Sequence, residues 1–127
     1  MVRGSVTDPG QLASLAARAA SSKQGEAIVV LDVRALITIT DYFVIVSGTS
    51  DRQVKTIAEE VVKTLKEQGT RPVRREGEPA AGWMLLDFVD FVVHVFSQEQ
   101  RDYYRLDNLW TDAPMLDWDE KAEAASR

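Results

Sequence analysis

The sequence contains no cysteine and a single histidine. The lack of cysteine excludes disulfides, thiolate nucleophiles and every metal site that depends on cysteine ligands. His94 alone cannot assemble the three or four nitrogen and sulfur ligands of an ordinary zinc site. A general base also needs a nucleophile or substrate proton in reach, and no neighbour of His94 in the sequence is an evident one. We therefore expect no metal, no cofactor and no catalytic residue.

Long apolar runs are absent as well. No stretch approaches the ~20 residues that cross a membrane as a helix, and residues 1–11 lack the apolar core of a secretion signal. We therefore expect a cytoplasmic protein without membrane contacts. The 127 residues, 45% of them hydrophobic, suffice for one core. We expect one domain over residues 1–118 and a disordered tail over residues 119–127.

Acidic residues gather in the last third of the chain. The net charge is -5, and residues 83–127 hold 10 acidic side chains against 4 basic ones. Phosphate binding needs a surplus of lysine and arginine, so this balance argues against a general nucleic-acid or DNA-binding protein. An acidic surface instead favours a basic partner. A solvated acidic tail over residues 112–123 is the alternative interpretation.

Local patterns predict an α/β fold. Ser50 with Gln53, and Ser97 with Gln100, match the capping box that opens a helix, and Pro114 is expected to end the ordered part. The order of elements predicts a mixed sheet of about five strands packed with helices. In the first half of the chain we expect a helix from Asp8 that fades at residues 23–25, strands over 27–33 and 42–47, and a helix over 50–68. An edge strand over 71–75 and a loop over 76–82 should follow. The chain should then form strands over 83–88 and 91–96, joined by a turn at Val89 and Asp90, and a last helix that carries Tyr103, Leu106 and Trp110 on one face.

A turn of small residues follows the strand at 42–47. Gly48, Thr49 and Ser50 precede a helix, as in nucleotidyltransferase folds, where such a turn cradles nucleotide phosphates. Those enzymes also bind magnesium through two carboxylates at alternating strand positions, whereas Asp87 and Asp90 are three residues apart. A capped strand-to-helix turn is the simpler interpretation. A nucleotide-binding protein or nucleotidyltransferase that uses this turn, with Asp87 and Asp90 as metal ligands, is the alternative function.

The two strands at 83–96 predict a sheet with two different faces. One side of each strand is wholly apolar. The other side mixes apolar residues with charged or titratable ones: Trp83, Leu85, Val92 and Phe96 with Asp87 and His94. Aromatic anchors beside scattered charges are typical of binding surfaces. A face half covered by the last helix is the alternative.

Several separated blocks of the sequence resemble the ribosomal silencing factor family, also called Iojap-like proteins. The resemblance covers residues 12–118, and Asp107 stands where the family usually has glutamate. The blocks are Asp41-Tyr42-Phe43-Val44-Ile45, Ser47-Gly48-Thr49-Ser50, Gly82-Trp83 with Asp87, Asp90-Phe91-Val92-Val93-His94-Val95-Phe96, and Arg101 with Tyr103-Tyr104-Arg105-Leu106 and Leu109-Trp110.

The resemblance implies a fold and a function. Family members have a nucleotidyltransferase-like topology without the catalytic metal site. They bind the large ribosomal subunit through its ribosomal protein L-fourteen, block the small subunit sterically and repress translation when nutrients are scarce. Relatives in organelles attend large-subunit assembly, and members are often homodimers. On this basis we expect a docking face with Trp83 as buried anchor, aspartates that pair with basic side chains and His94 as a polar contact: Trp83, Leu85, Asp87, Asp90, Val92 and His94.

Overall fold

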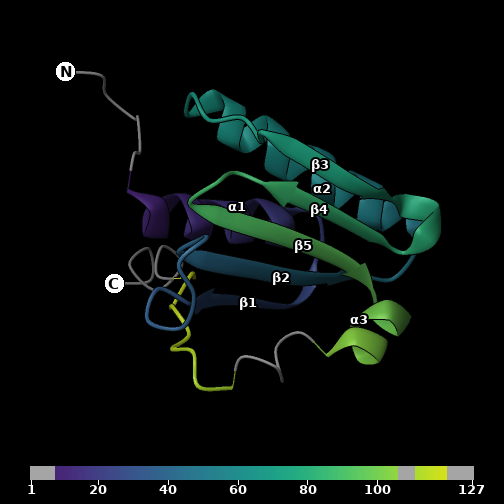
Figure 1. Cartoon of the computed structure of the whole chain (residues 1–127). Helices are drawn as coiled ribbons and strands as arrows, with labels where there is room; N and C mark the ends of the chain where they lie inside the picture. The colour runs from purple at the N-terminus through teal and green to yellow at the C-terminus, as the bar shows by residue number, and fades with distance from the viewer. Residues whose placement is uncertain (1–7, 106–110, 120–127) are drawn as a thin grey trace, which may run out of the picture.

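The described part of the chain folds into three α-helices, one short 3-10 helix and five strands, whose arrangement is drawn in Figure 1. The computed structural model describes residues 8–105 and 111–119. In chain order the elements are α1 (Pro9–Ser22), β1 (Glu26–Asp32), β2 (Tyr42–Gly48), α2 (Asp51–Glu67), β3 (Arg74–Glu78), the short 3-10 helix η1 (Pro79–Ala81), β4 (Trp83–Asp87), β5 (Phe91–Ser97) and α3 (Gln98–Tyr104).

The strands form one mixed sheet in the order β1-β2-β5-β4-β3. Its central pair, β2 and β5, is parallel, and the three other pairs are antiparallel. The predicted α/β class, with a mixed sheet of five strands packed with helices, is confirmed.

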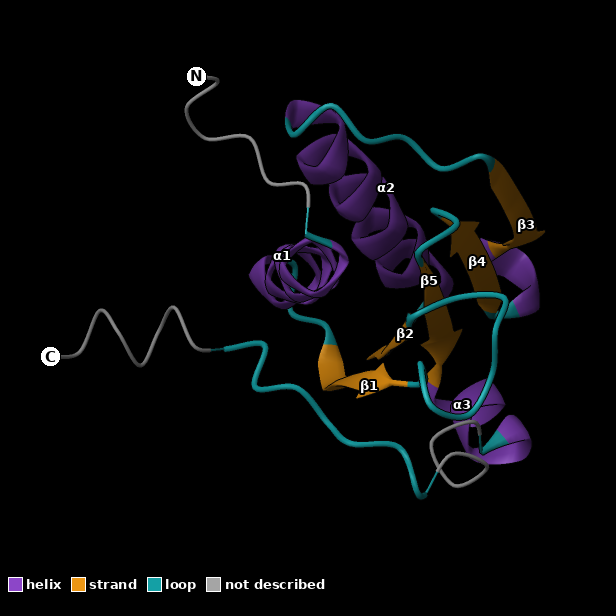
Figure 2. Cartoon of the chain, turned by 60° about the vertical axis from the view of Figure 1, so that its left-hand side comes forward, coloured by secondary structure: helices purple, strands orange, loops and turns teal. Residues whose placement is uncertain are grey.

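Helices α1 and α2 lie together on one face of the sheet (Figure 2). Four alanines of α1 are fully buried, and their small side chains let that helix lie close to the strands. Helix α2 contributes larger side chains at helical spacing, including Ile57 and Leu65, both 0% exposed. The main core therefore lies between these two helices and the alternate residues of β2, β4 and β5 that point toward them.

The predicted helix starts are confirmed by their caps. The side chain of Asp8 accepts from the amide of Gln11 at 3.0 Å, and Ser50 accepts from Gln53 at 3.1 Å. Ser97 does the same for Gln100 at 3.2 Å. Each cap satisfies an amide that has no partner inside its own helix.

The edge strand was predicted at residues 71–75 and the loop at 76–82, and both ranges are wrong. Strand β3 runs over Arg74–Glu78, because it pairs with the whole of β4, from Arg74 opposite Asp87 to Glu78 opposite Trp83. Gly77 permits this pairing, since its φ is 86° and a Cβ there would overlap the carbonyl oxygen of Trp83.

The expectation that Pro114 ends the ordered part is also wrong. The chain returns along the outer edge of β1, where the amide of Asp32 donates to the carbonyl of Pro114 and the amide of Leu116 donates to Val30, both at 2.8 Å. The indole of Trp118 donates to the carbonyl of Ile28 at 3.1 Å. This segment satisfies backbone groups that would otherwise leave a free sheet edge.

The last helix is shorter than predicted. It ends at Tyr104 because Arg105 adopts a left-handed conformation with φ 52°. Leu106 and Trp110, expected on one face of that helix, lie outside the described residues, as does the predicted tail beyond Asp119.

Candidate functional site: the second face of the sheet

The sheet face opposite α1 and α2 is built from alternate residues of neighbouring strands. Strand pairing aligns them in three rows across the sheet. The rows, each starting at β3, are Arg74, Asp87, Val92, Phe43 and Leu31; then Glu76, Leu85, His94, Ile45 and Val29; then Glu78, Trp83, Phe96 and Ser47.

Helix α3 is anchored at one end of this face. Arg101 is only 8% exposed, and its Nη1 donates to Ser47 Oγ at 3.0 Å. A second apolar cluster, which includes Ile45 and Phe96, lies at this face. Trp83, Leu85 and Val92 remain partly buried between that cluster and solvent. The face therefore keeps apolar side chains that a partner could cover.

His94 lies in the middle row between two aromatic rings. Its ring centre is 5.4 Å from that of Phe43, edge to face, and 5.9 Å from that of Phe96, stacked. Burial lowers the pKa of His94 to about 4, and Nδ1 is buried without a hydrogen-bond partner among the described residues. The imidazole is thus neutral near pH 7 and contributes mainly aromatic surface.

Two hydrogen bonds hold the side chain of Asp87, which lies in the first of the three rows. One of its oxygens accepts from Arg74 Nη2 at 3.2 Å, and the other accepts from the amide of Val89 at 2.8 Å. Arg74 also pairs with Glu76 at 2.9 Å. Because the arginine is shared with Glu76, the local charge of this group stays negative.

The structure brings five of the six predicted docking residues onto one face. The five that share it are Trp83, Leu85, Asp87, Val92 and His94. Asp90 is exposed in the turn between β4 and β5, beyond the end of this face. Sequence reasoning missed the members contributed by other strands: Phe43, Arg74 and Glu76. The alternation of Phe43, Ile45 and Ser47 was the available signal, but pairing register is not visible in a single sequence.

The residues of the alternative nucleotide site lie far apart. Gly48 is beside Ser97 in the sheet, whereas Asp87 is beside Val92, five residues away along β5. That separation is about 17 Å at ~3.3 Å per residue. Asp87 and the turn at Gly48 therefore cannot hold one nucleotide phosphate and its metal together. Among residues 8–105 and 111–119, no group of three or more histidine or acidic side chains could hold a metal ion.

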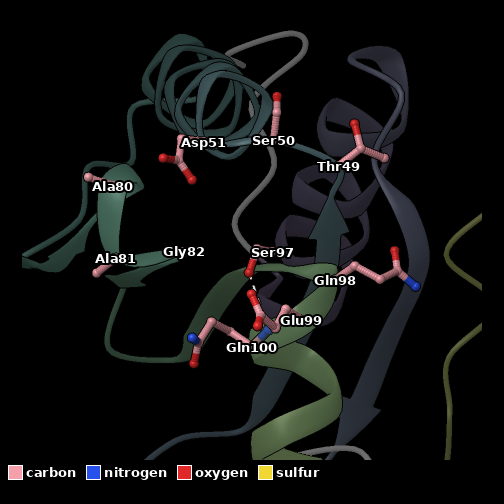
Figure 3. Close-up of a pocket in the computed structure, with 10 residues that line it drawn as sticks. All are labelled: Thr49, Ser50, Asp51, Ala80, Ala81, Gly82, Ser97, Gln98, Glu99 and Gln100. Carbon is pink, nitrogen blue, oxygen red and sulfur yellow. Dashed lines mark hydrogen bonds between the residues drawn. The ribbon is translucent and has the colours of Figure 1, made fainter.

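A pocket of about 360 Å³ adjoins the turn after β2 (Figure 3). The amide and hydroxyl of Thr49 both donate to Gln53 Oε1, at 2.5 and 2.8 Å, and the side chain of Ser50 is used as the cap of α2. Asp51 and Glu99 also line the pocket. Occupied donors and two carboxylates disfavour phosphate binding there.

A family model with the description "Ribosomal silencing factor during starvation" matches residues 6–127. The chain belongs to the ribosomal silencing factor family. It is 43% identical over 105 residues to the ribosomal silencing factor of Bacillus subtilis, covering 83% of this chain and 89% of that one. The crystal structure of a Chromobacterium violaceum protein superposes with a TM-score of 0.79 at 35% identity, covering 83% of this chain and 88% of that one.

Membership of the ribosomal silencing factor family confirms the resemblance drawn from the sequence and places the chain among regulators of translation. A mouse protein named for mitochondrial assembly of the ribosomal large subunit is 39% identical over 87 residues, which are 66% of this chain and 38% of that protein. No helix among the described residues is long and apolar enough to cross a membrane.

Proposed function

We propose that this ribosomal silencing factor binds the large ribosomal subunit through its ribosomal protein L-fourteen. Once bound, it sterically blocks association with the small subunit and so represses translation in the cytoplasm. The family and the name of the mouse relative support a role at the large subunit. The mechanism is binding without turnover, and it requires no cofactor.

The observation that carries this proposal is the second sheet face. This face offers the partly buried apolar side chains of Trp83, Leu85 and Val92. Hydrogen bonds hold the carboxylate of Asp87 at the edge of the face. Central aromatic anchors with a polar rim are the arrangement that supplies most of the energy in protein interfaces. The carboxylates favour a basic ribosomal protein and disfavour contact with ribosomal RNA.

Co-sedimentation with isolated ribosomal subunits tests the proposal. We expect the protein to pellet with large subunits and not with small ones. Trp83→Ala should weaken binding by about thirtyfold, since loss of an interface anchor costs about 2 kcal/mol or more. Binding unchanged by Trp83→Ala in a folded protein would remove this face as the docking surface.

A matched pair of charge variants separates local contact from net charge. Asp87→Asn and Glu59→Gln each remove one negative charge, but Glu59 is exposed on α2, at the opposite face of the sheet. We expect Asp87→Asn to weaken binding and Glu59→Gln to leave it unchanged. Equal effects of both variants would mean that overall charge, and not this face, governs binding.

Addition of small subunits at rising salt tests the block on subunit joining. Joined ribosomes should decrease with the amount of protein bound to large subunits. Large subunits that bind the protein and still join small subunits would contradict steric exclusion.

Sedimentation of the protein alone tests the predicted homodimer, because it measures the mass of the particle that the protein forms without ribosomes.

Nucleotide binding is the second candidate, supported only by the pocket beside Thr49 and Ser50. Any ligand that prefers the native state raises the unfolding midpoint. Thermal unfolding with magnesium and nucleoside triphosphates should therefore show no shift, and a clear shift would favour this candidate.

A further inference from the structure

The turn between β4 and β5 presents an exposed valine in a strained conformation. Val89 has φ 75° and is 53% exposed. The amide of Asp90 donates to the carbonyl of Phe88 at 2.9 Å, which makes Val89 the central residue of the rare, strained form of γ-turn. Positive φ is a marked outlier for a β-branched residue, and glycine or asparagine would adopt it more readily.

The geometry of this turn does not depend on the valine side chain. Its backbone is fixed by the amide of Val89 donating to Asp87 Oδ1 at 2.8 Å, by Phe88 donating to Phe91 at 2.9 Å, and by Asp41 donating to the carbonyl of Asp90 at 2.9 Å. Any residue that tolerates positive φ would complete the same bonds. The valine therefore lowers the stability of the fold through backbone strain and through exposed apolar surface, and the hydrogen bonds of the turn do not need its side chain.

Two other exposed apolar residues belong to segments that are bonded to this end of the hairpin. Ile39 is 83% exposed and lies two residues before Asp41, whose amide donates to the carbonyl of Asp90, and Val73 is 68% exposed and its amide donates to the carbonyl of Asp87. We call Ile39, Val73 and Val89 the apolar rim. The loop between β1 and β2 lies at the same end of the sheet as the turn (Figure 1). The three residues of the rim therefore belong to segments at the end of the sheet where Asp87 lies.

We propose that Val89 is a contact residue for the basic ribosomal protein, seated in an apolar notch bordered by lysine or arginine side chains. This inference rests on the proposed function. Asp87, which accepts from the amide of Val89 and from Arg74, and the exposed Asp90, which follows Val89 in the chain, supply acidic groups next to the valine, and an apolar tip with acidic neighbours is complementary to a notch with basic walls. Rigid presentation avoids the ordering cost of a flexible loop on binding.

Val89→Asn tests the proposal, with Gln24→Asn as its matched control. Gln24 also has a positive φ, 68°, but it lies in the link between α1 and β1 at the opposite end of the sheet. Both variants should keep or raise the unfolding midpoint. Only Val89→Asn should weaken co-sedimentation with large subunits, by roughly fivefold or more. Val89→Thr, which keeps the shape and the strain but loses apolar surface, should weaken binding in the same direction.

The outcomes separate this inference from the proposed function. Wild-type affinity in both Val89 variants, together with weaker binding by Trp83→Ala, would overturn the role of Val89 and leave the second face as docking surface. Equal weakening by Gln24→Asn would overturn it too, because relief of strain rather than contact would then explain the effect. Failure of the wild-type protein to pellet would overturn both.

Discussion

Between pH 7.5 and pH 5, the stability of this protein should depend on pH mainly through His94. It is the only histidine of the chain, and burial lowers its pKa from 6.5 to about 4. As the pH falls below 6.5, the unfolded chain binds a proton at this site before the folded chain does. The free energy of unfolding is therefore highest above pH 6.5 and falls as the pH approaches 4.

The size of the effect follows from that difference in pKa. A gap between 6.5 and about 4 corresponds to about 3 kcal/mol over the whole range, of which about 2 kcal/mol is lost by pH 5. Asp32 does not interfere, because its hydrogen bonds with Arg34 lower its pKa below 3.8. Its stabilisation is fully present above that value and is lost only in more acidic solution.

Urea unfolding followed by tryptophan fluorescence, at pH 7.5 and pH 5.0, measures the difference. His94→Phe is the control, since it keeps an aromatic ring between Phe43 and Phe96 and removes the titrating group. The wild-type protein should lose about 2 kcal/mol between the two conditions, and the variant should lose little. The reasoning fails if the wild-type free energy is the same at both pH values, or if His94→Phe retains the loss.

Two further predictions, the first with a control variant, test the corrected parts of the fold. Gly77→Ala should lower the free energy of unfolding by about 3 kcal/mol, because a Cβ would overlap the carbonyl of Trp83, whereas Gly69→Ala, at φ 80° with nothing within 4 Å, should cost only about 1 kcal/mol. Equal losses in urea would show that conformation alone, and not contact, decides the cost. Trp118→Phe removes the indole bond to Ile28 and should cost about 1 kcal/mol, measured by thermal unfolding; an unchanged midpoint would mean that the bond adds no net stability.

Elements with local causes could be predicted from the sequence. The starts of α2 and α3 depend on Ser50 and Ser97, whose side chains act within three residues along the chain. The two faces of β4 and β5 follow from alternation, which also acts over short distances. For this reason five of the six residues that were predicted to dock a partner share one face of the sheet, while their docking role stays a prediction.

Features that depend on pairing between distant segments could not be predicted. The position of β3 is set by contact with all of β4, and the return of residues 111–119 is set by the unpaired edge of β1. Neither partner is identifiable from local pattern. The same reason explains why Phe43, contributed by β2, was missed beside His94.

The neutrality of His94 also bears on which partners the second face would accept if it is the docking surface proposed above. A protonated imidazole would place a positive charge at the centre of the face and repel a basic protein. Burial between Phe43 and Phe96 lowers its pKa to about 4, so the nearby carboxylates of Asp87 and Glu76 are not offset by a charge on the histidine in neutral solution. The sequence expectation of His94 as a polar contact stays a prediction; the structure shows that its Nδ1 is buried and that the rings of Phe43 and Phe96 lie near its own. If the second face is the docking surface proposed above, its apolar centre with the carboxylates of Asp87 and Glu76 at the margin suits a basic protein surface, whereas these carboxylates would repel the phosphates of RNA.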